Sequence, residues 1–124
     1  FLNLVGIRVR SADSFKTSTD GVICISDLEQ LKAILSNCNG RRDSMFIATW
    51  SISEVPVNVR KSVLPLTYQF KGFLIAYQEK FGEVNNIEFF SDWKTVQGDV
   101  EWYNWEIEHL KHNAYLVGKR TAEK

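Results

Sequence analysis

The stretch from Pro65 to Gly82, PLTYQFKGFLIAYQEKFG, constrains the fold more than any other part of the chain. Its large apolar side chains recur at the spacing that places them on one side of a helix. Proline is tolerated in the first turn of a helix because its missing N–H would have no partner there, and glycine commonly ends a helix. The pattern therefore predicts one long amphipathic helix, whose apolar stripe consists of Leu66, Phe70, Phe73, Leu74, Tyr77 and Phe81.

The composition is that of a chain with one packed core. Of its 124 residues, 44% are hydrophobic and 13% aromatic, which fits a single globular domain over residues 1–124. The longest apolar run, Phe73 to Ala76, is far shorter than the roughly 20 residues of a membrane-spanning helix. Cys24 and Cys38 are expected to be free and buried, and FLNLVGIRVR lacks the basic start of a secretory signal. We therefore expect a cytoplasmic protein.

The first half of the chain alternates strand-like and helix-like patterns. Residues 2–10 and 21–25 have the composition of strands, and DLEQLKAILSN at 27–37 has that of a short capped helix. Residues 45–52, MFIATWSI, are apolar on both faces, which predicts a central strand. Residues 56–63 fit a short helix, or a strand that ends near Val59.

The second half after Gly82 is predicted to be mostly strand. NIEFFSDWKTV at 86–96 alternates in side-chain character, and a tight hairpin turn is predicted to follow at 97–100. Residues 100–110 fit either a strand or a helix, and their three aromatic residues favour the strand. A turn at 111–113 and a closing strand at 114–119 complete an antiparallel meander.

These elements together predict an α+β fold. We expect a mostly antiparallel sheet of about five to six strands, with two or three helices packed on one face. The helices and strands do not alternate strictly, which argues against a doubly wound parallel sheet.

Few patterns in the sequence indicate catalysis. The glycines are too far apart to form a nucleotide-binding loop, and no Gly-x-Ser-x-Gly motif occurs. His109 and His112 are the two histidines, and with Glu106 or Glu108 they could supply metal ligands or a general base. Their other interpretation is a pair of polar residues beside a turn. We therefore expect no metal and no cofactor, and we expect Cys24 to be a poor nucleophile because it lies in the apolar run GVICI.

Charge is unevenly distributed along a chain whose formal net charge is zero. Residues 79–108 carry eight acidic and two basic side chains, a local net charge of −6. The same segment holds three of the four tryptophans, and an acidic surface with exposed aromatic residues is typical of a site that docks a basic protein. The other interpretation is that many of these acids are ordinary solvated positions and that the tryptophans are core residues. The candidate partner-binding residues are Asp92, Trp93, Asp99, Glu101, Trp102, Trp105, Glu106 and Glu108.

The leading hypothesis is a non-enzymatic protein-binding module, such as an inhibitor, antitoxin or immunity protein that covers the cationic active site of a nuclease or toxin. No membrane partner is expected, and nucleic acid is an unlikely partner. The first alternative is a nucleic-acid-binding accessory domain, which would use scattered basic residues. The second is a small enzyme with His109 or His112 as base and a glutamate as its partner. The residues of the nucleic-acid alternative are Arg8, Arg10, Arg41, Arg42 and Lys61.

Overall fold

The computed structural model describes residues 9–11, 22–37 and 44–121. Backbone contacts divide the chain into two compact units, Phe1–Asn39 and Gly40–Lys124, and each is described by itself. The single domain that the composition suggests stays a prediction.

The first unit contains two short parallel strands and a helix. Strand β1 (Val9–Ser11) pairs with β2 (Val22–Cys24), and α1 (Leu28–Asn37) follows. The backbone N–H of Glu29 donates to the Asp27 carboxylate at 2.8 Å, so Asp27, and not the other candidate Ser26, caps the predicted helix. Cys24 is exposed, which corrects its expected burial. Most of the predicted strand at 2–10, and Cys38, lie outside the described residues.

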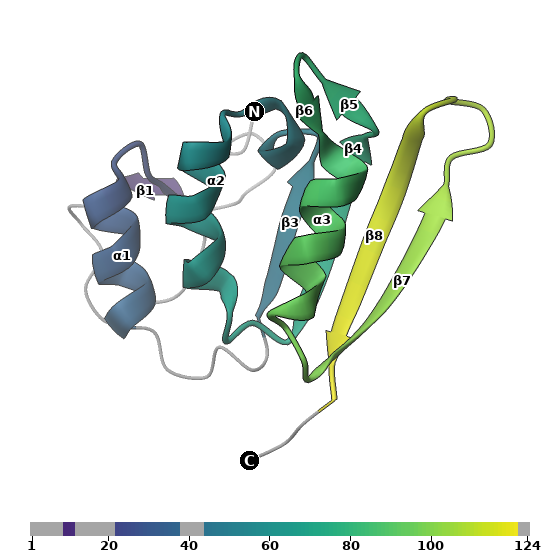
Figure 1. Ribbon diagram of the computed structural model, residues 1–124. Helices are drawn as coiled ribbons and strands as arrows, with labels where there is room; N and C mark the ends of the chain where they lie inside the picture. The colour runs from purple at the N-terminus through teal and green to yellow at the C-terminus, as the bar shows by residue number, and fades with distance from the viewer. Residues whose placement is uncertain (1–8, 12–21, 38–43, 122–124) are drawn as a thin grey trace. The chain divides into compact units, whose positions relative to one another are not determined.

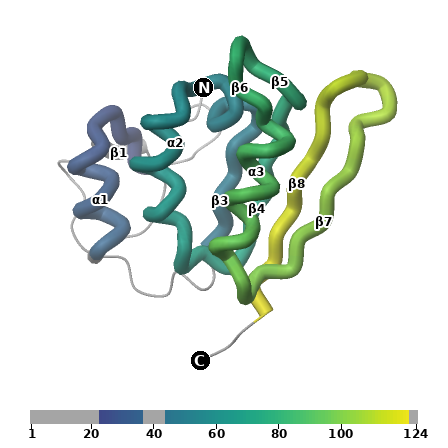
Figure 2. The backbone as a smooth tube through the Cα atoms, in the orientation of Figure 1, coloured from purple at the N-terminus to yellow at the C-terminus, as the bar shows by residue number. Residues whose placement is uncertain are grey.

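The second unit is built on a mixed four-stranded sheet (Figure 1, Figure 2). The strands lie in the order β3-β4-β8-β7, with β3 and β4 parallel and β8 antiparallel to both β4 and β7. The α+β class is thus confirmed, whereas the mostly antiparallel sheet is wrong. The bounds are β3 Met45–Thr49, β4 Gly72–Gln78, β7 Val100–Glu106 and β8 Asn113–Arg120, with a small separate hairpin of β5 Lys80–Phe81 and β6 Val84–Asn85.

Helices cover one face of this sheet (Figure 1). Helix α3 (Asn86–Thr95) packs Phe90 and Trp93 against the strands, and α2 (Val57–Val63) lies beside it between two short 3-10 turns, Ile52–Glu54 and Leu64–Thr67. Helix α2 confirms the helical interpretation of residues 56–63. The core between the helices and the sheet includes Phe73, Ile75, Tyr77, Phe90, Trp93 and Leu116.

The predicted long helix from Pro65 to Gly82 is wrong. Residues 64–67 form a 3-10 turn, Gly72–Gln78 form β4, and Lys80–Phe81 form β5. The helical stripe combined side chains from three separate elements with Phe70, which lies in the segment between two of them. GFLIAYQ is a short apolar run of the kind found in central strands, and β4 indeed lies between β3 and β8.

The predicted strand at 86–96 is also wrong, because this segment is α3. Asn85 caps the helix, and its side chain accepts a hydrogen bond from the backbone N–H of Glu88 at 3.1 Å. This is the sequence signal that strand-like alternation hid, since Asn followed three residues later by Glu is a capping pattern. Phe89, Phe90 and Trp93 then gather on one side of the helix.

The last hairpin of the predicted meander is confirmed by β7 and β8, which pair from Val100↔Arg120 to Glu106↔Ala114. The predicted hairpin turn at 97–100 is wrong, because this turn joins α3 to β7. The predicted central strand at 45–52 is confirmed as the strand β3 but lies at the sheet edge. In β3 the side chain of Ala48 is buried, and those of Met45 and Ile47 are exposed.

A buried arginine joins the covering elements to each other. The Arg60 side chain has no exposed surface, and burial lowers the pKa of its guanidinium. It donates to the Val55 carbonyl at 3.0 Å, the Ser53 carbonyl at 2.7 Å and the Asn86 side-chain oxygen at 2.6 Å. Its guanidinium also lies 4.7 Å from the centre of the Phe89 ring. Arg60 of α2 therefore holds α3 and the first 3-10 turn in place.

Candidate functional site

Two of the predicted aromatic anchors lie in the core. Trp93 is 7% exposed, and Trp102 is half-buried. The Trp102 ring centre lies 5.2 Å from that of Phe73 and 5.1 Å from that of Trp93. These two indole rings therefore fill the space between α3 and the sheet, and they stabilise the fold instead of forming the surface.

The third predicted anchor, Trp105, is on the surface. It is 53% exposed and stacks on Tyr103, which is 50% exposed, with ring centres 6.1 Å apart and planes 18° from parallel. The Tyr103 hydroxyl donates to the Glu101 carboxylate at 3.2 Å, and the charge of Glu101 raises the pKa of Tyr103. We call Glu101, Tyr103, Asn104, Trp105 and Glu106 the aromatic edge.

The aromatic edge borders a sheet face that α2 and α3 do not cover. Side chains alternate along strands, so Tyr103 and Trp105 point to the side opposite Trp102. Ala76 of this face is buried, but its larger apolar residues are only partly buried or exposed, and no helix of the described range 44–121 packs on it. They are Met45, Ile47, Leu74, Tyr115 and Val117.

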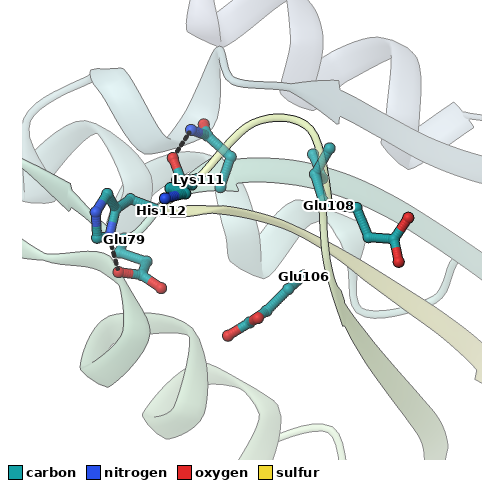
Figure 3. A pocket seen from close by; sticks show the side chains of 7 residues that line it. Glu79, Glu106, Glu108, Lys111 and His112 are labelled. Carbon is teal, nitrogen blue, oxygen red and sulfur yellow. Dashed lines mark hydrogen bonds and ion pairs between the residues drawn. The ribbon is translucent and has the colours of Figure 1, made fainter.

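A hollow of about 520 Å³ lies at the end of the β7–β8 hairpin. Figure 3 shows His112 turned toward Glu79, while Glu108 points away from this pair. His112 Nδ1 is 3.1 Å from Glu79 Oε2, and the backbone N–H of Glu79 donates to the His112 carbonyl at 2.8 Å. We call this site the hairpin hollow, and it is lined by Glu79, Glu106, Ile107, Glu108, Lys111, His112 and Asn113.

The turn that carries His112 is held in a constrained conformation. His112 has a φ of 66°, a left-handed backbone that is uncommon for a residue other than glycine. The next residue fixes the turn, because Asn113 accepts from Trp50 Nε1 at 2.7 Å and donates to the Lys111 carbonyl at 3.0 Å. His109 is exposed and does not line the hollow.

The remaining predicted acids lie apart from these two sites. Asp99 follows α3 at the opposite end of β7 and pairs with Arg120, whose hydrogen bond lowers the pKa of Asp99. Asp92 is exposed on α3, on the covered side of the sheet. The structure thus places Glu101 on the same face of β7 as Trp105, Glu106 beside Trp105 but on the opposite face, and Glu108 at the hollow. It separates Asp92, Trp93, Asp99 and Trp102 from Trp105.

Sequence reasoning missed the pairing of His112 with Glu79. The two residues are separated by 33 positions, and no local pattern joins them, because the contact depends on β4 lying next to β8. The sequence did indicate that Tyr103 lies beside Trp105. The two residues are two positions apart in a predicted strand, so their side chains share a face. Within the described ranges, no group of three or more histidine, cysteine or acidic side chains could hold a metal ion.

The basic residues of the nucleic-acid alternative are largely outside the described parts of the chain. Arg8, Arg41 and Arg42 fall there, and the side chain of Arg10 is not described. Lys61 is exposed on α2. Among the described helices, none is long and apolar enough to cross a membrane.

Comparisons of the chain with protein-family models, with curated proteins and with solved structures found no match.

Proposed function

We propose that this protein is a non-enzymatic binding module that docks a basic partner protein through the aromatic edge. The observation that carries the proposal is the stacked pair of Tyr103 and Trp105, each about half exposed on one strand. Such large rings cost free energy in water and are the residues most often found at the centre of protein interfaces. The pair therefore supplies the apolar anchor of the proposed interface.

The acidic side chains determine which partner fits. Glu101 lies beside the rings on the same face, and Glu106 and Glu108 follow at the hairpin end. Such an arrangement accelerates association with a positively charged protein and disfavours nucleic acid. A cytoplasmic inhibitor, antitoxin or immunity protein of a nuclease needs an acidic surface of this kind to cover a cationic active site. This comparison rests on charge and not on fold.

Reversing the charge of Glu106 and Glu108 to lysine should slow association with the partner at least about tenfold at low salt, because steering depends on these carboxylates. The partner is first captured with a photoreactive residue at position 105, in cells that express the protein naturally. Association rates of the purified pair are then measured by stopped-flow fluorescence at low and high salt.

The matched control is Glu88→Lys with Asp92→Lys, which changes the net charge equally on exposed positions of α3. Its effect on the association rate should be clearly smaller. If both double variants slow association equally, the effect depends on the net charge of the protein and not on the position of the carboxylates. That result would contradict the proposed surface. Capture of acidic proteins at position 105 would contradict the proposed partner.

The hairpin hollow favours a second candidate function, a small enzyme that uses His112 as a general base. If Nδ1–H donates to Glu79, then Nε2 carries the free lone pair that accepts a proton from a substrate. Glu79 has the role of the group that orients the imidazole. The hollow gives a ligand access to this nitrogen, since the His112 side chain is 81% exposed.

For this enzyme, nitrogen NMR should show the Nδ1–H tautomer of His112 in the unmodified protein. Glu79→Gln should shift the population toward the other tautomer, because a neutral amide is a weaker acceptor. Glu106 lines the same hollow without a hydrogen bond to His112 in the structure. The control substitution Glu106→Gln should therefore leave the tautomer of His112 unchanged. A predominant Nε2–H tautomer would remove His112 as a base.

A further inference from the structure

The outer edge of β7 has backbone groups that point away from the sheet. At the two ends of the β7–β8 ladder, Thr121 N–H donates to the Asp99 carbonyl and Ile107 N–H to that of Asn113, both at 2.9 Å. In an antiparallel pair, alternate residues face the partner strand. The odd-numbered residues of β7 therefore bond to β8, and Trp102, Asn104 and Glu106 direct their N–H and C=O groups outward.

No strand lies beyond β7 in the described part of the chain (Figure 1, Figure 2). An edge with unpaired backbone donors and acceptors is a template for a further strand. Natural edges are commonly protected by proline, a bulge or lysine, and β7, with the sequence VEWYNWE, contains neither proline nor lysine. Its backbone pairing with β8 runs without a break from Val100 to Glu106.

We infer that β7 binds an extended basic segment of the partner protein, which adds to the sheet as a further strand. This inference rests on the proposed function and specifies its binding mode. Backbone hydrogen bonds to Trp102, Asn104 and Glu106 supply the affinity, and the neighbouring side chains Glu101, Tyr103 and Trp105 supply the selectivity.

Charge determines the occupant of this edge. Strand β7 carries Glu101 and Glu106 and no cationic side chain. A second copy of the chain would bring four carboxylates to one strand pair with no cation, and the antiparallel register centred on Glu106 places it directly opposite Glu106 of the other copy. Like charges at opposed positions are destabilising. A basic segment instead gives each carboxylate an opposite charge.

The spacing of the two carboxylates predicts the pattern of the segment. Glu101 and Glu106 are five positions apart and point to opposite faces. In a paired strand, the residues opposite them are also five apart. The segment is therefore expected to carry arginine or lysine at this spacing, with β-branched residues between them that contact Tyr103 and Trp105.

The test uses a synthetic peptide of about ten residues with two arginines five positions apart and valine and threonine between them, and a counterpart with glutamates. Hydrogen exchange is followed by NMR with and without peptide. In the free protein, the amides of Asn104 and Glu106 should exchange fast and those of Tyr103 and Trp105 slowly. The arginine peptide should protect Asn104 and Glu106, and the glutamate peptide should not. Unprotected outward amides in the presence of the bound arginine peptide would overturn the inference.

Asn104→Pro and Asn104→Thr form a matched pair of variants. Both remove the hydrogen bond that the Tyr77 hydroxyl donates to the Asn104 side-chain oxygen over 3.3 Å. Proline also removes the outward N–H, and it is tolerated at a sheet edge because that N–H faces solvent. Asn104→Pro should weaken peptide binding about tenfold or more relative to Asn104→Thr, the factor expected for a lost backbone hydrogen bond. Equal affinity of the two variants would overturn strand addition.

The oligomeric state separates the remaining outcomes. Concentration-dependent dimers that Asn104→Pro dissociates would show a second copy on this edge and overturn the basic occupant. If the partner captured at position 105 binds both Asn104 variants equally but depends on Glu106 and Glu108, strand addition fails and the proposed function stands. If no partner is captured there while the arginine peptide protects the outward amides, the proposed function fails instead.

Discussion

Replacing Arg60 with methionine is expected to lower the free energy of unfolding by about 3 kcal/mol, the largest effect of a single substitution that the structure suggests. Methionine fills much of the same space but donates no hydrogen bond. The Val55 carbonyl and the Asn86 side-chain oxygen would lose the donor that Arg60 gives them. Burial disfavours the guanidinium charge, so removing this charge offsets part of the lost stability. The cost of leaving buried acceptors without donors is larger. Urea denaturation followed by tryptophan fluorescence measures the change.

Lys61→Met is the matched control for this substitution. It makes a similar replacement of a cationic side chain one position further along α2, where the side chain is exposed. Its effect should stay within about 0.5 kcal/mol. A loss below about 1 kcal/mol for Arg60→Met would show that water or a neighbouring side chain replaces the lost donors.

Replacing Gly118 with alanine is expected to cost about 2–3 kcal/mol, because the core is already filled at this point. A Cβ at Gly118 would lie 2.5 Å from Cζ3 of Trp102 and 2.7 Å from its Cε3. The indole cannot withdraw easily, since Phe73 and Trp93 contact it. Thermal and urea denaturation of the variant measure the loss.

A double-mutant cycle identifies the cause of the Gly118 effect. In the background of Trp102→Leu, which removes the clashing ring, Gly118→Ala should cost less than about 0.5 kcal/mol. Gly98→Ala is the control for the loss of a glycine, because a Cβ there meets no atom within 4 Å. An equal cost of Gly118→Ala in both backgrounds would refute the clash and point to the backbone of β8.

Local signals predicted the elements whose patterns have one reasonable interpretation. Asp27 and the leucine spacing after it predicted α1, and the aromatic run of residues 100–106 with the turn at 111–113 predicted the β7–β8 hairpin. At residues 65–82 and 86–96 the same kind of reasoning failed. At residues 65–82, apolar residues of three elements matched a helical period by chance. At residues 86–96, alternating side chains led to the prediction of a strand, although Asn85 and Glu88 form the capping pattern of a helix.

The candidate site was predicted in part for the same reason. Alternation along β7 placed Trp102 and Trp105 on opposite faces of the sheet. Both rings could therefore not pack against the same layer of helices. It did not indicate which face the helices would cover, and the structure places Trp102 inside and Trp105 outside. The concentration of acids in residues 79–108 is a property of the sequence, yet α3 and the hairpin carry these acids to different sides of the sheet.

The sequence by itself determined the α+β class, the helix after Asp27, the C-terminal hairpin and the local excess of negative charge. Those features depend on residues near one another in the chain, whose spacing and turn chemistry can be read directly. Only the tertiary structure decided the strand order, the buried Arg60, the contact of His112 with Glu79 and the exposure of Trp105. Each of these depends on which strands become neighbours and which face is covered, and that is set by the packing of the whole core.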